Sequence, residues 1–85
     1  MNAINWQPKA LLQLRKLDAQ AGKQIRIAVT TELVDLSKAR NVKALTNHDC
    51  SHRLRVGSYR VLFDFDSAVR IVSIEEVRKR DERTY

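Results

Sequence analysis

The sequence contains few of the residues that tie a small protein to an oxidising compartment or a membrane. Its 85 residues include one cysteine, Cys50, so no disulfide can form within the chain. No apolar run approaches the roughly 20 residues that span a bilayer. The chain also does not start with a basic segment followed by an apolar stretch, as a signal peptide does. We therefore expect a cytoplasmic protein without a membrane partner.

The common catalytic patterns are also missing. The sequence has no P-loop, no Cys or His pairs at zinc spacing and no Ser-His-Asp arrangement that spacing reveals. We therefore expect no metal and no small-molecule cofactor. His48, Asp49 and His52 form the one His/Asp cluster, but His52 falls on the expected core side of a strand. We interpret this cluster as structural.

Basic residues outnumber acidic ones. The sequence has 16 Lys and Arg residues and ten Asp and Glu residues, which gives a net charge of +6 and a pI of about 10.0. With 44% hydrophobic and 31% charged residues, the composition is typical of a globular chain, and the length fits one domain over residues 1–85. The excess of cations indicates a polyanionic partner such as nucleic acid. Solubility alone is the alternative explanation.

The first half of the chain has a helical period. Residues 3–6 alternate as a short strand, and Pro8 suits the first position of a helix that extends to about Leu17. Asp18 is placed to cap a second helix. The apolar side chains of that helix recur along one stripe: Ile25, Ala28, Val29, Leu33 and Leu36.

The second half changes to an alternating period. A polar connection over residues 37–50 leads to expected strands at 51–56, 58–65 and 68–75. Element order predicts an α+β fold, in which a two-helix hairpin packs on one face of a four-stranded, mainly antiparallel sheet that includes the short first strand. The last turn has two interpretations. A two-residue turn would place Val72 and Ile74 in the core, whereas a three-residue turn would place Val69 and Ile71 there.

Three arginines share one surface of the first hairpin. Gly57-Ser58 is a two-residue, glycine-first turn, which sets Arg55 opposite Arg60. Because faces alternate along a strand, Arg53, Arg55 and Arg60 project together. Like charges directly opposite each other destabilise a sheet. This arrangement therefore predicts a polyanion on that face.

The C-terminal segment adds more cations and an aromatic residue. Arg78, Lys79, Arg80 and Arg83 follow the last expected strand, and Tyr85 ends the sequence. A guanidinium forks onto two phosphate oxygens, and a tyrosine ring stacks on an unpaired base. An alternative is a solvated tail without a ligand.

Three segments resemble the RelE/ParE superfamily of bacterial toxins. They are Ile-Asn-Trp-Gln-Pro-Lys-Ala-Leu near the start, Arg-Leu-Arg-Val-Gly-Ser-Tyr-Arg-Val-Leu-Phe in the middle and Lys-Arg-Asp-Glu-Arg-Thr-Tyr at the end. The resemblance covers nearly the whole sequence, and the middle segment is its most specific part. It implies the same fold as the element order, two helices on an antiparallel sheet.

The resemblance implies the toxin of a type II toxin–antitoxin system. Such RelE-like toxins are ribosome-dependent, metal-independent endoribonucleases that cleave mRNA in the A site, with the 2′-hydroxyl of the RNA as nucleophile. A cognate antitoxin, here expected to be acidic or amphipathic, holds the toxin inactive. The implied catalytic positions are Arg53, Arg55, Arg60, Arg80 and Tyr85. The implied RNA- and ribosome-binding positions are Arg78, Lys79 and Arg83.

Two positions depart from the RelE pattern. The best-understood members carry lysines where this chain has Arg53 and Arg55, and one of those lysines is the proposed base. Arginine has a pKa above about 12, so roughly one molecule in a million is neutral at pH 7. Three routes remain for the proton: electrostatic activation of the 2′-hydroxyl, His52, or a ribosomal group. A protein that does not cut RNA is the fourth explanation.

Two other functions remain open. A ParE-like toxin would inhibit DNA gyrase by binding, without nuclease chemistry. An RNA-binding module would use the basic face without toxicity. The set of Arg60, Arg80 and Tyr85 favours the ribonuclease, because a protein that only binds has no need of it.

Overall fold

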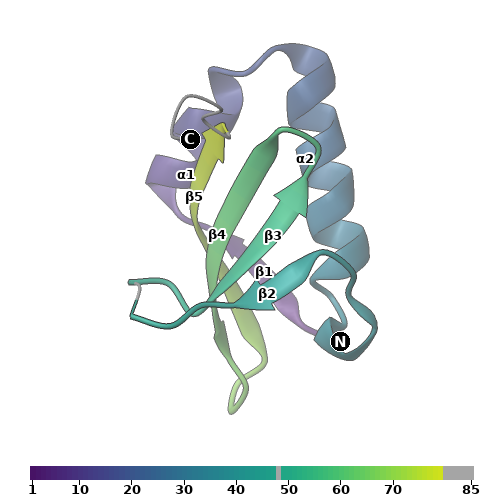
Figure 1. Cartoon of the computed structure of the whole chain (residues 1–85), viewed down its shortest axis with the longest axis vertical. Coiled ribbons are helices and arrows are strands. Elements are labelled where there is room, and N and C mark those ends of the chain that lie inside the picture. The colour runs from purple at the N-terminus through teal and green to yellow at the C-terminus, as the bar shows by residue number, and fades with distance from the viewer. Residues whose placement is uncertain (48, 80–85) are drawn as a thin grey trace.

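The computed structural model describes residues 1–47 and 49–79, which form a five-stranded sheet with helices on one face (Figure 1). In the sheet order the strands are β1 (Ala3–Trp6), β5 (Ile71–Lys79), β4 (Tyr59–Asp66), β3 (His52–Val56) and β2 (Val42–Ala44). β1 runs parallel to β5, and every other neighbouring pair is antiparallel. The predicted α+β class is confirmed.

The two helices begin where the sequence predicted. Pro8 starts α1 (Pro8–Arg15), in which its missing N–H costs no hydrogen bond. Asp18 caps α2 (Ala19–Glu32), because its Oδ1 accepts a 2.8 Å hydrogen bond from the Ala21 backbone N–H. α1 ends at Arg15, slightly earlier than expected. Figure 1 shows α2 running along the sheet beside β3, with α1 behind β5.

A single hydrophobic core lies between the helices and the sheet. Its helix side comes from Ala10, Leu14, Ile25, Val29 and Leu33, and its sheet side comes from Leu54, Val61, Phe63, Val72, Ile74 and Val77. All of these side chains are buried. Ile25, Val29 and Leu33 of the predicted stripe therefore pack on the sheet, whereas Leu36 lies beyond the end of α2, in a separate 3₁₀ turn. None of the helices in the described ranges is long and apolar enough to cross a membrane.

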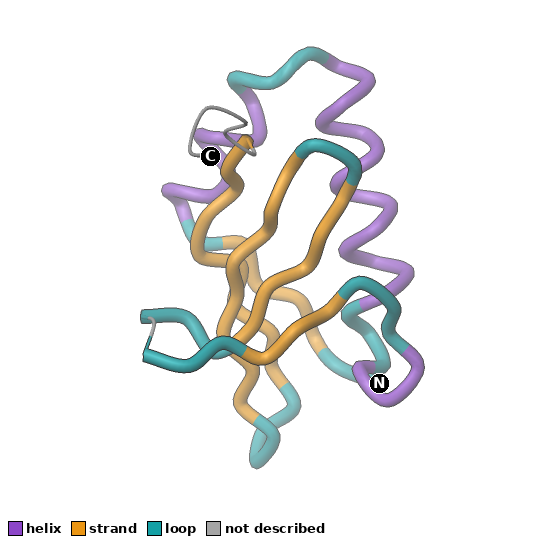
Figure 2. The backbone as a smooth tube through the Cα atoms, in the orientation of Figure 1, coloured by secondary structure: helices purple, strands orange, loops and turns teal. Residues whose placement is uncertain are grey.

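The sheet has one strand more than the four that the sequence predicted. The extra strand, β2, lies in the expected polar connection, where Val42 pairs with Leu54. It is three residues long, so it offers too few positions for an alternating pattern to stand out. A short 3₁₀ helix, η1 (Leu36–Lys38), precedes it. Figure 2 shows the described residues between β2 and β3, 45–47 and 49–51, extending away from α2.

The first hairpin has the predicted register. Val56 pairs with Tyr59 and Arg55 pairs with Arg60, so Gly57 and Ser58 form a two-residue turn. Gly57 has a φ of 55°, the left-handed value that the first position of such a turn requires. The arginine face predicted for β3 and β4 is therefore present.

The turn of the second hairpin is longer than the two or three residues that the sequence suggested. Asp66 pairs with Ile71, which leaves four residues, 67–70, in the loop. Because four and two have the same parity, Val72 and Ile74 still point into the core, as the two-residue interpretation predicted.

A β-bulge separates the two halves of β5. Phe63 pairs with Ile74 but Leu62 pairs with Glu76, so Glu75 is an extra residue that no residue of β4 faces. The alternation of β5 is thereby shifted by one position. Val77 enters the core, and Arg78 joins Arg60 on the opposite face.

Candidate nucleic-acid interface

Three arginines from three neighbouring strands surround one hollow on the sheet face that the helices leave open. The hollow has a volume of about 130 Å³ and is lined by Arg53 of β3, Arg60 of β4, Arg78 of β5, Leu62 and Leu45. We call Arg53, Arg60 and Arg78 the arginine cluster. Such a concentration of guanidinium groups suits a phosphate, because each group donates charge-assisted hydrogen bonds in a planar fork.

Strand register brings the cluster together. Arg60 lies opposite Arg78 on one side, and Arg53 lies opposite Leu62. Leu62 lines the hollow with only 4% of its surface exposed, and Leu45 reaches the hollow from the connection after β2. These apolar walls partly exclude water, which strengthens the attraction between guanidinium groups and a bound anion.

Arg53 has a donor without a partner. Its Nε is buried and makes no hydrogen bond, which is the one such side-chain atom in the described ranges. A buried donor left unpaired costs about 1–3 kcal/mol, and more when it is charged. An anion in the hollow would give this nitrogen an acceptor. Arg53 and Arg60 are half-buried, whereas Arg78 is exposed.

A carboxylate holds the third arginine. Glu76 accepts hydrogen bonds from Arg78 Nε at 3.1 Å and from Arg78 Nη2 at 3.2 Å, and it forms a 3.2 Å ion pair with Lys9 of α1. Burial raises the pKa of Glu76, but the hydrogen bonds from Lys9 and Arg78 outweigh burial and bring it below the ordinary value of 4.5. Glu76 is therefore ionised at neutral pH.

Arg55 lies apart from the cluster. It pairs with Arg60 across the hairpin, yet it is exposed and lines a different hollow between β3 and α2. That hollow has a volume of about 410 Å³, and its lining includes Ile27 and Thr31. The structure thus joins Arg53 to Arg60, as predicted, but adds Arg78 to the cluster where Arg55 was expected.

The remaining predicted residues belong to the C-terminal segment. Lys79 pairs with Tyr59, so alternation places it on the side of the helices, where it is exposed. Arg80, Arg83 and Tyr85 lie outside the described residues. Their catalytic and binding roles stay predictions.

His52, the strand residue of the His/Asp cluster, lies on the core side as predicted. The His52 ring stacks on Phe63 with a centroid distance of 5.4 Å, and its Nδ1 lies 2.8 Å from Ser51 Oγ. His48 lies outside the described residues. Over the described ranges, no three His, Cys, Asp or Glu side chains are grouped so that they could hold a metal ion.

Cys50 does not have the properties of a nucleophile. It is buried, and burial raises the pKa of its thiol, with a further increase from the nearby charges of Asp64, Glu75 and Glu76. A thiol with a raised pKa stays protonated at neutral pH, and the thiol is far less nucleophilic than the thiolate.

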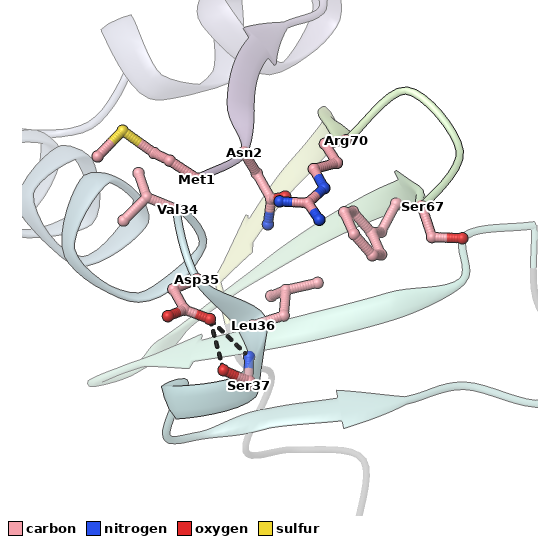
Figure 3. A pocket seen from close by; sticks show the side chains of 9 residues that line it. Met1, Asn2, Val34, Asp35, Leu36, Ser37, Ser67 and Arg70 are labelled. Atoms are coloured by element: carbon pink, nitrogen blue, oxygen red, sulfur yellow. Dashed lines mark hydrogen bonds between the residues drawn. The ribbon is translucent and has the colours of Figure 1, made fainter.

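A larger hollow lies at the other end of the sheet, where β1 begins (Figure 3). It has a volume of about 420 Å³, and Asn2, Asp35, Ser37 and Arg70 are among the residues that line it. Asp35 Oδ1 accepts hydrogen bonds from the backbone N–H and the hydroxyl of Ser37, which Figure 3 shows as dashed lines. The lining combines an acid with a base, so it does not concentrate one sign of charge as the arginine cluster does.

Sequence reasoning missed two residues of the site. Glu76 belongs to no motif and Lys9 had no predicted role, because their ion pair joins α1 to β5 across 67 positions of sequence. Leu45, in the connection that the sequence predicted to be polar, also lines the hollow. Because the sequence contains many charged residues, it does not indicate which of them form ion pairs in the fold.

The fold is that of RelE toxins. The chain superposes on the isolated RelE toxin of Escherichia coli with a TM-score of 0.77, 18% identity and coverage of 96% of this chain and 87% of that one. For the toxin–antitoxin complex RelBE2 of Mycobacterium tuberculosis, the TM-score is 0.73 at 21% identity, with 93% and 98% covered. For the archaeal RelE–RelB complex of Pyrococcus horikoshii, the TM-score is 0.71 at 19% identity, with coverage of 95% of this chain and 97% of that one. No protein-family model and no curated protein matches the sequence.

Proposed function

We propose that this chain is the toxin of a type II toxin–antitoxin system, and that it cleaves mRNA in the ribosomal A site. The fold supports the toxin role, since the similar structures are RelE toxins. The observation that carries the ribonuclease proposal is the arginine cluster, where Arg53, Arg60 and Arg78 line one hollow and a buried Arg53 donor lacks a partner.

The cluster suits in-line attack of a 2′-hydroxyl on the adjacent phosphate. Attack forms a bond from the 2′-oxygen to phosphorus and breaks the bond to the 5′-oxygen. The products are a 2′,3′-cyclic phosphate and a 5′-hydroxyl, the leaving 5′-oxygen taking its proton from water. Negative charge grows on the non-bridging oxygens as the phosphorane forms. Arg60, half-buried at the centre of the cluster, is the donor that we assign to these oxygens. Removing one such donor costs about 100- to 1,000-fold in rate.

The proton of the 2′-hydroxyl needs an acceptor that the cluster does not supply. None of the three arginines can take it at neutral pH. His52 points to the core side, where it stacks on Phe63, so it is also a poor acceptor. We propose that the positive field of the cluster lowers the pKa of the hydroxyl and that a group of the ribosome takes the proton.

The proposed inhibitor is a cognate antitoxin. Five of the similar structures are complexes of a RelE protein with RelB or with a RelB peptide. A net charge of +6 favours an acidic or amphipathic partner segment, because opposite charges speed association and select the partner.

Reconstituted translation tests the proposal. Primer extension is expected to show breaks in translated mRNA and none in the same RNA without ribosomes, and Arg60→Ala is expected to abolish the breaks. Arg26→Ala, which removes an exposed arginine of α2, is the matched control and keeps full activity. A gyrase supercoiling assay runs in parallel. Inhibited supercoiling together with intact mRNA would replace this proposal by the ParE-like function.

A further inference from the structure

α1 reaches the outer edge of β5 where β1 has already ended. β1 pairs with β5 only from Ile71 to Ile74, so the next part of β5 has no strand on that side. Gln13 of α1 fills this position, because its Oε1 accepts a 2.7 Å hydrogen bond from the Val77 backbone N–H. One turn earlier on α1, Lys9 forms its ion pair with Glu76. The helix therefore holds the bulged end of β5 through two side chains.

Glu76 in turn fixes the plane of the Arg78 guanidinium. The two oxygens of the carboxylate accept from Nε and Nη2, which is a bidentate pair. The Glu76 side chain is only 16% exposed, whereas that of Arg78 is 58% exposed. The carboxylate is thus the more buried partner, and its two hydrogen bonds restrain an exposed side chain near a strand end. The pair leaves the Nη1 hydrogens of Arg78 available to another acceptor.

The charge balance indicates that Glu76 orients Arg78 and does not compete with a phosphate for it. Glu76 has two cationic partners, Lys9 and Arg78, so these three groups together keep one positive charge. An incoming phosphate therefore still meets a positive site. Arg53, Arg60 and Arg78 would repel one another in the hollow, and a carboxylate beside them reduces that repulsion.

We propose that Glu76 is a positioning residue that orients Arg78 for phosphate binding, and that Lys9 and Gln13 of α1 hold the strand that carries it. The proposal deepens the proposed function and rests on it only for the identity of the ligand, a phosphodiester. It also explains why an acidic residue lies on a face that otherwise gathers cations.

NMR spectra of the arginine Nε–Hε groups, with inorganic phosphate as the probe, test this directly. In the wild-type chain we expect a separate Arg78 signal, which phosphate shifts together with those of Arg53 and Arg60. In Glu76→Gln the Arg78 signal is expected to collapse toward the average position. Phosphate affinity should fall about threefold to tenfold, as when one charge-assisted hydrogen bond loses its orientation.

The controls separate positioning from overall charge and from folding. Glu75→Gln removes the same charge one residue away, where no ion pair is formed within the described ranges, and should leave the Arg78 signal in place. In an Arg78→Ala background, Glu76→Gln should cause no further loss of affinity.

Stronger phosphate binding in Glu76→Gln, or an Arg78 signal that stays separate, would overturn the proposal. If the NMR result holds but Arg78→Ala still cleaves mRNA fully, the proposed function fails at this site while the positioning role stands.

Discussion

Arg60 and Arg78 lie directly opposite each other on neighbouring antiparallel strands, although both carry a positive charge. Like charges in such a position destabilise a sheet by up to about 1 kcal/mol. On its other side Arg60 also faces Arg55. Stability alone gives no reason for three cations in one row, and the anionic ligand that we propose would offset their repulsion.

Arg60→Ala is expected to abolish growth arrest when the chain is expressed without an antitoxin. The rate of mRNA cleavage should fall about 100- to 1,000-fold, because the variant loses the donor assigned to the phosphorane. Removing a cation from a row of like charges should leave the free energy of unfolding unchanged or slightly higher. Full growth arrest by this variant would remove Arg60 from the mechanism.

Gln13→Ala is expected to destabilise the protein by about 1–3 kcal/mol, since the Val77 N–H loses its acceptor. Urea unfolding measures the total effect, and amide hydrogen exchange should show faster exchange at Val77. Gln20→Ala is the matched control, because Gln20 is exposed on the first turn of α2. Equal losses in the two variants would show that α1 does not secure the edge of β5.

Stability should decrease in acid through Glu76. Its pKa is lower in the folded state than the ordinary 4.5, so its contribution is complete above the unfolded-state pKa. The contribution is lost as pH falls below 4.5 and through the folded-state pKa. Melting temperatures of the wild type and Glu76→Gln should therefore differ at pH 7 and converge in acid. A difference that does not depend on pH would contradict this assignment.

Arg70→Gly is expected to stabilise the protein by about 1 kcal/mol. Arg70 has a φ of 57° in the β4–β5 loop, a conformation that costs an L-residue about 1–2 kcal/mol and glycine almost nothing. Thermal unfolding measures the change. Val69→Gly, at a neighbouring loop position without positive φ, should give no gain, and a gain of equal size there would show that backbone strain is not the cause.

The first hairpin and the helices could be predicted because local chemistry determines them. The Gly57-Ser58 turn fixes the register that places Arg53 and Arg60 on one face, and Asp18 determines where α2 begins. The position of Arg78 could not be predicted in this way. Strict alternation from the second turn would put Arg78 on the core side, and only the bulge at Glu75 moves it beside Arg60.

Contacts between residues far apart in the sequence could not be predicted either. The pairing of Lys9 with Glu76 depends on how α1 lies against β5, which no local pattern encodes. Arg55 was predicted to join Arg53 and Arg60, yet it lines the hollow between β3 and α2 and not the hollow of the arginine cluster. A residue can thus lie on the predicted face and still be outside the site.

Mapping the 5′ ends of cellular transcripts after brief induction tests the central claim most directly. We predict new ends inside reading frames, at fixed positions within codons, in cells that express the wild-type chain but not in cells that express Arg60→Ala. Growth arrest without such ends, or ends spread equally over untranslated RNA, would contradict ribosome-dependent cleavage by the arginine cluster.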